Sequence, residues 1–182
     1  MHGAAVGEFF GACRRDGTPV DEPIYDARKR VASYLEERVE RGVRAACLAD
    51  AELAVVKAAE DLLPSFEGEH PVPCHGDYCP ANWLVRPDAS WAGVIDFEMA
   101  RWDVRVADLA RHPDWEWIER PSLLDAFFDG YGRSFTPKDE QQLFVARVQF
   151  ALTAIVWGSE NDYNGFVREG QEALKQLGKA LS

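Results

Sequence analysis

The stretch CHGDYCPAN, residues 74–82, decides the fold together with VIDFE, residues 94–98. Two short apolar segments, residues 83–85 and 92–95, lie between them, and the turn-forming sequence RPDAS separates the two segments. This pattern predicts a small β-hairpin. Because antiparallel pairing brings the two ends of a hairpin together, we expect Asn82 and Asp96 to lie close to each other at its open end.

An Asp, an Asn five residues later and a second Asp after an apolar run suit the transfer of a phosphoryl group from a Mg-nucleotide. Asp77 would accept the proton of the acceptor hydroxyl or orient that hydroxyl. Asn82 would bind Mg²⁺ through its amide oxygen, and Asp96 would bridge Mg²⁺ to the β and γ phosphates. His75 is expected to hold the loop by hydrogen bonds, and Gly76 permits a tight backbone.

These residues resemble the catalytic core of the aminoglycoside phosphotransferase family, which also contains choline-kinase-like enzymes. The shared pattern is H-G-D-x-x-x-x-N-x-L-[VIL] at residues 75–85, followed by [VI]-I-D-F-E-x-A at residues 94–100. The family's D-L-A element is matched by residues 108–110, where Asp108 would support the catalytic loop. Glu98 stands where protein kinases have the glycine of D-F-G, which favours a small-molecule kinase. The resemblance implies ATP (or GTP) and Mg²⁺ as co-substrate and metal, and a small-molecule hydroxyl as acceptor.

The resemblance covers only the second of the family's two lobes. We therefore interpret residues 1–182 as a single domain, mainly α (α+β), equivalent to the helical C-terminal lobe, with the N-terminal nucleotide-binding lobe absent. Lys57 imitates the strand lysine of that lobe, but it lies in a helical pattern and is interpreted as a surface residue. Gly130-Tyr131-Gly132 is interpreted as a helix end and not a phosphate loop. The chain could be a fragment of a longer kinase, the missing lobe could come from another subunit, or this lobe could work without catalysis. An apolar surface left exposed without that lobe would favour a homo-oligomer.

Apolar spacing predicts helices on both sides of the hairpin. Before it, we expect an amphipathic helix around residues 6–13, with Gly3, Gly7 and Gly11 along one face. Further helices are predicted over about residues 26–41 and from Asp50, as N-cap, to Pro64. After the hairpin, the predicted helices cover residues 104–111, 121–131, a long central helix capped by residues 136–137, and a last helix over residues 163–181.

Composition limits the possible functions. The chain has 182 residues, 47% hydrophobic and 28% charged, which is typical of a packed globular protein. Its 20 basic and 31 acidic residues give a net charge of −11, which argues against nucleic acid as a partner. The sequence has no export signal and no apolar run long enough to span a bilayer, so we expect a cytoplasmic protein without a membrane partner. Its cysteines, which lack CxxC spacing and a second ligand pair, are predicted to be free thiols and not zinc ligands.

The acidic balance would also attract a cationic acceptor, although an acidic surface can simply aid solubility. In the resembled family the acceptor pocket is acidic when the substrate is a polyamine sugar. Candidate substrate contacts are Glu98, Trp157, Glu160 and Asp162, the last two placed at the start of the last helix. Weaker candidates are Asp103, Asp114, Glu116, Trp115 and Trp117. Two other functions stay open: a non-catalytic module that binds a small molecule or a partner chain, and a metal-dependent hydrolase using Asp77, His75 and Asp96.

Overall fold

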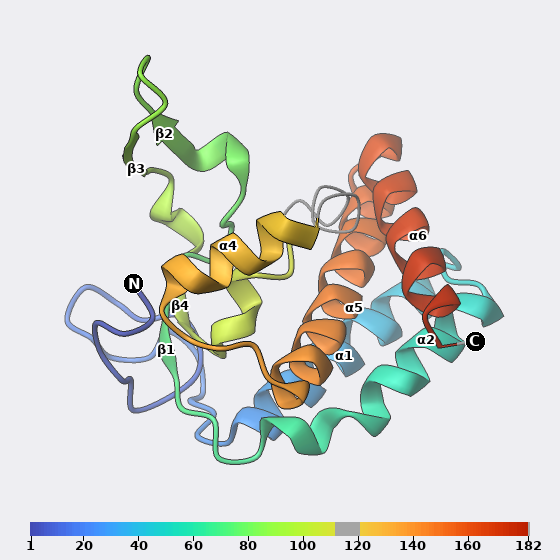
Figure 1. Ribbon diagram of the computed structural model, residues 1–182. Helices are drawn as coiled ribbons and strands as arrows, with labels where there is room; N and C mark the ends of the chain where they lie inside the picture. The colour runs from blue at the N-terminus through green and yellow to red at the C-terminus, as the bar shows by residue number, and fades with distance from the viewer. Residues whose placement is uncertain (112–120, 182) are drawn as a thin grey trace.

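The fold is mainly helical, as the sequence predicts. The computed structural model describes residues 1–111 and 121–181, except for the side chains of residues 121 and 124 (Figure 1). The α-helices of this part are α1 (Ala27–Arg44), α2 (Asp50–Asp61), α4 (Pro121–Tyr131), α5 (Pro137–Glu160) and α6 (Asn164–Lys179). Its strands are β1 (Val72–Cys74), β2 (Trp83–Val85), β3 (Trp91–Val94) and β4 (Arg101–Asp103). No helix in this part is both long and apolar enough to cross a membrane.

The long helix α5 forms the centre of the core, and it packs against α1, α2 and α6. It begins as predicted at Pro137, after a capping box in which the Asp139 N–H donates to the Thr136 hydroxyl and the Asp139 carboxylate accepts from the Thr136 N–H. Leu152 and Ile155 in its middle are fully buried. Because α5 is surrounded by other helices, its sequence is apolar on several sides and not along one stripe.

The helix α6 lies against α5 at close range. A Cβ atom on Gly170 would stand 2.5 Å from the carbonyl oxygen of Ala151, so the two backbones approach too closely for a side chain at this point. Leu174, one turn later, is fully buried. The last helix is thus held by the apolar stripe that predicted it.

We call residues 74–82 the catalytic segment, after their predicted role. The helices before it, α1 and α2, are close to their predicted bounds. Asp26 caps α1 by accepting from the Lys29 N–H at 2.6 Å. Asp50 is the first residue of α2 and not its cap; the cap is Ala49, whose N–H donates to the Glu52 carboxylate at 2.6 Å. The α2 helix ends before Pro64, which lies in a short 3-10 helix.

The predicted helix around residues 6–13 is wrong, because residues 1–26 contain no helix. In this segment Phe10 pairs with Ile24, and Gly11 pairs with Trp102 in isolated antiparallel bridges. Each glycine in this segment weakens a helix by about 1 kcal/mol relative to alanine. Val6, which the helical pattern assigns to the buried face, is exposed in the structure.

Two small antiparallel sheets frame the catalytic segment. The predicted hairpin forms from β2 and β3, with Trp83 opposite Val94, and Figure 1 shows it standing away from the helices. The second sheet pairs β1 with β4, with Cys74 opposite Arg101, and the sequence analysis missed it. Each of its strands is only three residues long, too short to produce a visible alternation. The two sheets together fix where the segment between Cys74 and Trp83 begins and ends.

The predicted helix over residues 104–111 is also wrong. This region contains only a short 3-10 helix, η4, at Arg105–Asp108. Its backbone turns early because Asp108 is drawn under the catalytic segment, where its carboxylate accepts hydrogen bonds from backbone N–H groups. A tertiary contact therefore overrides the local helical pattern here.

Candidate active site

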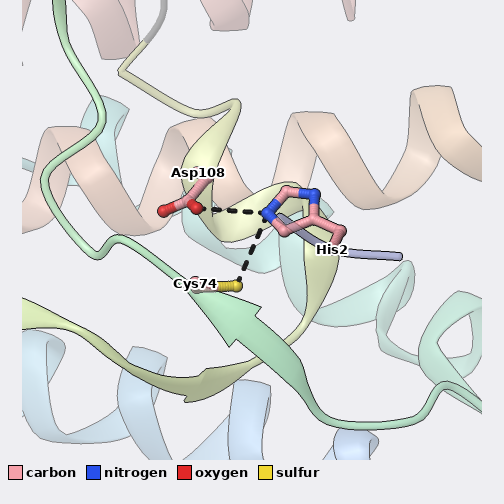
Figure 2. A group of neighbouring side chains, drawn as sticks. All are labelled: His2, Cys74 and Asp108. Atoms are coloured by element: carbon pink, nitrogen blue, oxygen red, sulfur yellow. Dashed lines mark hydrogen bonds and ion pairs between the residues drawn. The ribbon is translucent and has the colours of Figure 1, made fainter. Parts of the chain in front are cut away.

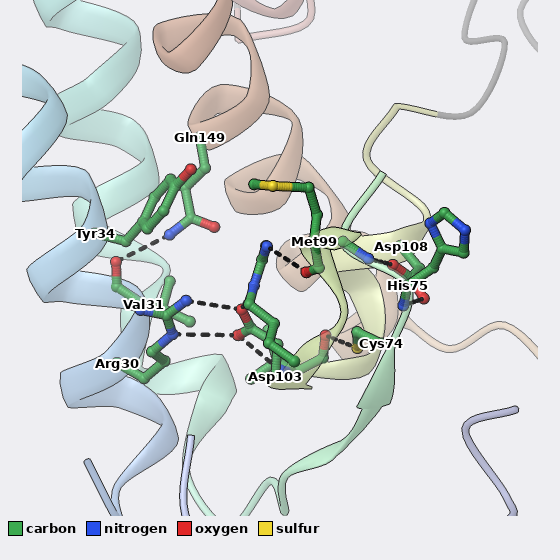
Figure 3. Close-up of polar contacts among 12 residues, drawn as sticks. Arg30, Val31, Tyr34, Cys74, His75, Met99, Asp103, Asp108 and Gln149 are labelled. Carbon is green, nitrogen blue, oxygen red and sulfur yellow. Dashed lines mark hydrogen bonds and ion pairs between the residues drawn. The ribbon is translucent and has the colours of Figure 1, made fainter. Parts of the chain in front are cut away.

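Asp108 holds the start of the catalytic segment. Its carboxylate oxygens accept from the His75 N–H at 2.7 Å and from the Gly76 N–H at 2.8 Å (Figure 3). The side chain is buried, so water does not compete for these bonds. These contacts to the main chain agree with a supporting role for Asp108, which stays a prediction.

Gly76 is where the backbone turns toward Asp77. Its φ is +83°, and a Cβ atom at this position would lie 2.2 Å from the Met99 carbonyl oxygen. Both observations require glycine, because a side chain would be strained and would collide with the segment that follows Asp96. The backbone at Gly76 is tight, in agreement with its predicted supporting role.

His75 ties the catalytic segment to the end of the hairpin. The imidazole is fully buried, with Nε2 at 2.8 Å from the Ile95 carbonyl oxygen. The Asp77 N–H donates to Nδ1 at 3.3 Å. These partners assign the proton to Nε2, so both ring nitrogens are engaged within the protein. These bonds agree with the predicted loop-holding role, and they disfavour the hydrolase hypothesis, which needs His75 to face a substrate.

The side chain of Asn82 is oriented by hydrogen bonds to Asp77. Its Nδ2 donates to the Asp77 carbonyl oxygen at 2.9 Å and to the Asp77 carboxylate at 3.1 Å. The amide group is therefore fixed with both of its hydrogen atoms directed at Asp77, which leaves its oxygen for another partner. Asn82 is nearly buried, at 8% exposure, so this orientation is restrained by packing as well.

Asp96 follows the open end of the hairpin. The Ile95 N–H donates to the Asn82 carbonyl oxygen at 3.0 Å, which extends the β2–β3 pairing to the residue before Asp96. The predicted closeness of the two ends is confirmed. Asp96 has φ 68° and ψ 61°, the left-handed region, and its side chain is exposed. An Asp tolerates this conformation better than most residues, but it still costs about 1 kcal/mol or more, and such strain is common at functional sites.

A cavity of about 280 Å³ opens beside Asp77. It is bounded by the catalytic segment, by α1, by α5 and by Phe166 of α6. Of the predicted site residues, Gly76, Asp77 and Trp157 line it, and so does the weaker candidate Asp103. The expected metal ligands Asn82 and Asp96 are not among its described lining residues.

The other predicted substrate contacts do not line the cavity. Glu160 ends α5, and it accepts a hydrogen bond from Arg41 Nε at 3.0 Å. Asp162 lies in the connection to α6, which begins at Asn164, so neither acid starts the last helix as expected. Glu98 is exposed in a short 3-10 helix after Asp96. Asp114, Trp115, Glu116 and Trp117 lie outside the described residues.

Arg111 is a site residue that the sequence analysis missed. Its guanidinium group forms an ion pair with the Asp77 carboxylate. It also lies over the rings of Phe150, at 5.6 Å, and Phe166, at 5.8 Å. These aromatic contacts come from α5 and α6, more than thirty residues away, so no local pattern indicates them. The only sequence signal is that Arg111 directly follows the D-L-A element.

Asp103 anchors the opposite wall of the cavity. It is 5% exposed, and it accepts from Arg30 Nη2 at 2.9 Å and from Arg101 Nε at 2.7 Å (Figure 3). Burial alone would raise the pKa of Asp103, but the two guanidinium groups hold it below its usual value. Asp103 is therefore ionised, and it joins α1 to β4 beneath the cavity.

A buried group of three side chains, His2, Cys74 and Asp108, lies behind the catalytic segment (Figure 2). His2 Nε2 is 3.1 Å from the Asp108 carboxylate and 3.9 Å from Cys74 Sγ. The three are close enough to hold a metal ion, but Asp108 already accepts two backbone N–H groups. Burial and the nearby Asp108 raise the pKa of the Cys74 thiol, which also donates to the Val104 carbonyl oxygen. We interpret the group as hydrogen-bonded packing and not as a metal site.

Comparison with known proteins identifies the family. Residues 3–143 match the profile of the phosphotransferase enzyme family. The matched range includes both parts of the motif, residues 75–85 and 94–100, and the D-L-A element at residues 108–110. The chain belongs to this family. No curated protein matches the sequence significantly. The family resemblance inferred from residues 75–100 is therefore confirmed.

Solved structures of phosphotransferases share the fold. One is a thermostable mutant of the aminoglycoside phosphotransferase APH(4)-Ia in ternary complex with AMP-PNP and hygromycin B, with a TM-score of 0.68 and 15% identity; the match covers 100% of this chain and 61% of that one. Another is a macrolide 2'-phosphotransferase type I, with a TM-score of 0.57 and 20% identity over 81% of this chain and 48% of that one.

A third solved structure is a putative fructosamine-3-kinase from Thermobifida fusca YX-ER1, with a TM-score of 0.53 and 22% identity over 94% of this chain and 60% of that one. The chain thus spans about three fifths or less of the length of these neighbours. At such low identities the likeness shows the fold, a mainly α kinase-like fold, and not the substrate.

Proposed function

We propose that this chain carries the catalytic and metal-binding residues for transfer of the γ-phosphoryl group of ATP, or GTP, to a hydroxyl group of a small molecule. The observation that supports this most is the position of Asp77. Its carboxylate lines a cavity on one side, and on the other side it is hydrogen-bonded to Asn82 at 3.1 Å. Contact with both the cavity and Asn82 supports a role for Asp77 as the proton acceptor between the acceptor and the nucleotide's metal ion.

The residues present fit a Mg²⁺ ion. The Asn82 amide is fixed by two hydrogen bonds through its nitrogen, which leaves its oxygen free to act as a metal ligand. Asp96 offers an exposed carboxylate one residue beyond the strand pairing. Mg²⁺ takes one or two such oxygen ligands in addition to water and phosphate oxygens. When bound, it would neutralise charge on the β and γ phosphates.

Asp77 would act on the acceptor. It would accept a hydrogen bond from the acceptor hydroxyl, align that oxygen with the γ-phosphorus and receive the hydroxyl proton. A P–O bond to the acceptor forms while the P–O bond to the leaving nucleoside diphosphate breaks. Asn82 would keep the carboxylate of Asp77 in place, and His75 and Asp108 would fix the backbone on either side of Gly76. Other parts of the family's kinase-like architecture would complete the nucleotide site.

Phosphoryl transfer from labelled ATP and calorimetric binding of Mg–AMP-PNP test this proposal, with the chain alone and with a nucleotide-covering lobe supplied in trans. Asp77→Asn should lower turnover by about 10²–10⁴-fold with little change in nucleotide binding. Asp96→Asn should weaken the binding of Mg–AMP-PNP. Asp61→Asn, an exposed acid on α2, is the matched control and should change neither.

Turnover that persists in Asp77→Asn within about ten-fold of the unchanged chain would contradict the proposal. Small-molecule binding that is unchanged by Asp77→Asn and Asp96→Asn, and unaffected by Mg–AMP-PNP, would instead support the non-catalytic binding module.

A further inference from the structure

The cavity beside Asp77 has the opposite charge from the protein around it. The whole chain carries a net charge of −11, but the charged residues that line the cavity, within ranges 1–111 and 121–181, are four arginines and two aspartates. The arginines are Arg30, Arg38, Arg101 and Arg111, and the aspartates are Asp77 and Asp103. The sequence predicted an acidic pocket for a cationic acceptor. The described residues do not form such a pocket.

The arginines on the wall formed by α1 and β4 outnumber their acidic partners. Arg30 and Arg101 share the single carboxylate of Asp103, at 2.9 Å and 2.7 Å. Arg38 donates to Glu37 at 2.8 Å, but Glu37 is half exposed and is outside the cavity lining. An excess of positive charge therefore remains in a partly enclosed space, where it is screened less than on an open surface.

Neutral polar groups continue the same wall between α1 and α5. The Tyr34 hydroxyl lies 3.1 Å from the Thr153 hydroxyl, and Arg38 Nε donates to Thr153 at 3.3 Å. The Arg38 guanidinium also lies 4.7 Å from the centre of the Tyr34 ring, which restrains it. Burial would raise the pKa of Tyr34, but its bond to Thr153 and the charge of Arg38 lower it, as expected in a positive field.

Arg111 is placed where it can exchange partners. Its ion pair with Asp77 occupies the carboxylate that must accept a hydrogen bond from the acceptor. The aromatic rings of Phe150 and Phe166 hold its guanidinium at the cavity, and 37% of its side chain is exposed. An anionic group entering the cavity would offer Arg111 a second carboxylate-like partner, and Asp77 would then be released toward the hydroxyl.

Building on the proposed function, we propose that the acceptor is a small hydroxylated anion, bearing a carboxylate or a phosphate, and that Arg111 binds its charge. The volume of about 280 Å³ is at the small end of ligand pockets, which suits a single ring or a short chain and not a multi-ring polycation. Arginine binds carboxylate and phosphate through paired hydrogen bonds, which fixes orientation as well as affinity.

The γ-phosphate of the nucleotide is a second possible source of the same anionic chemistry. The geometry favours the acceptor, because Asn82 and Asp96, the expected metal ligands, lie outside the cavity lining. The cavity is lined by Tyr34 and Trp157 in addition to Asp77. The experiment separates the two sources by adding nucleotide.

Calorimetry of the chain at low ionic strength tests the inference with inorganic phosphate and with three sugars matched in ring but not in charge: glucuronate, glucose and glucosamine. We expect phosphate to bind, and glucuronate to bind at least about ten-fold more tightly than glucosamine. Arg111→Met, which keeps the apolar stem, should weaken phosphate binding by about ten-fold or more, and Arg111→Lys should weaken it less.

Arg28→Met is the control, because Arg28 is an ion-paired arginine of α1 that does not line the cavity. It should leave phosphate binding unchanged, and thermal unfolding should show that all variants are folded. The inference is overturned if glucosamine binds more tightly than glucuronate, if neither anion binds at up to about 10 mM, or if Arg28→Met has the same effect as Arg111→Met. Loss of phosphate binding on addition of Mg–AMP-PNP would also overturn it, by assigning the anion site to the nucleotide.

These readouts do not depend on turnover. Anion binding without phosphoryl transfer would leave this inference standing and count against the proposed function. Phosphoryl transfer to a cationic acceptor would support the proposed function and count against this inference.

Discussion

Asp108→Ala tests how the catalytic segment is held. The change removes the carboxylate that accepts from the His75 N–H at 2.7 Å and from the Gly76 N–H at 2.8 Å. Asp108 is only 3% exposed, so water cannot easily replace these bonds. A buried donor left without a partner costs about 1–3 kcal/mol, and two donors are affected, so we expect a loss of about 2–6 kcal/mol in the free energy of unfolding. That is a large share of the roughly 5–15 kcal/mol available to a domain.

The assay is urea unfolding followed by circular dichroism and tryptophan fluorescence. Asp61→Ala is the control, because it removes an exposed carboxylate paired with Lys57 at 2.7 Å and should cost about 0–1 kcal/mol. Asp108→Asn keeps one acceptor oxygen and should lose about half as much as Asp108→Ala. A value for Asp108→Ala within about 0.5 kcal/mol of the control would refute the reasoning, since the two backbone donors would then have other partners.

Two further predictions concern the same region. Gly76→Ala should destabilise the protein by roughly 2–6 kcal/mol, because alanine is strained at positive φ and its Cβ would collide with a backbone carbonyl. Gly130→Ala, at an open helical position, is the control and should be neutral or stabilising. Thermal unfolding of both variants measures the difference. The pKa of Asp103 is held below its unfolded value of about 3.9, so its contribution to stability is present above that pH and is lost as the pH falls through the folded value. The gap in unfolding free energy between the wild type and Asp103→Asn should therefore narrow below about pH 4 in acid titrations, and a gap that stays constant would show that Asp103 is not the titrating group.

The catalytic segment could be predicted from the sequence because its geometry is local. Asn82 and Asp96 are joined by a hairpin with a short turn, and turn composition and strand length are visible in the residues themselves. The same holds for α5, whose cap at Thr136 and Pro137 is a sequence signal. Where an element is fixed by neighbours in the chain, the prediction was confirmed.

The errors occur where distant contacts decide the structure. Residues 6–13 have helical spacing, but their backbone pairs instead with Ile24 and Trp102. The region of Asp108 has helical spacing too, and it turns early to reach the catalytic segment. In both cases backbone groups find better hydrogen-bond partners far away in the sequence than in the next helical turn.

The character of the acceptor cavity is the clearest case of this limit. Its arginines come from α1, β4 and the segment after η4, and each is unremarkable in its own stretch of sequence. Glu160 and Asp162, the acidic residues predicted to contact the acceptor, do not line the cavity, and Glu160 forms an ion pair with Arg41. A net charge of −11 describes the whole surface, but it does not determine the sign of one cavity. The residues to which we assign the proposed phosphoryl transfer thus lie in one continuous stretch, residues 75–96, whereas the residues that line the cavity are brought to Asp77 by the fold. If the cavity binds the acceptor as we propose, a change at Arg111 will alter the acceptor preference and leave the motif that identifies the family unchanged.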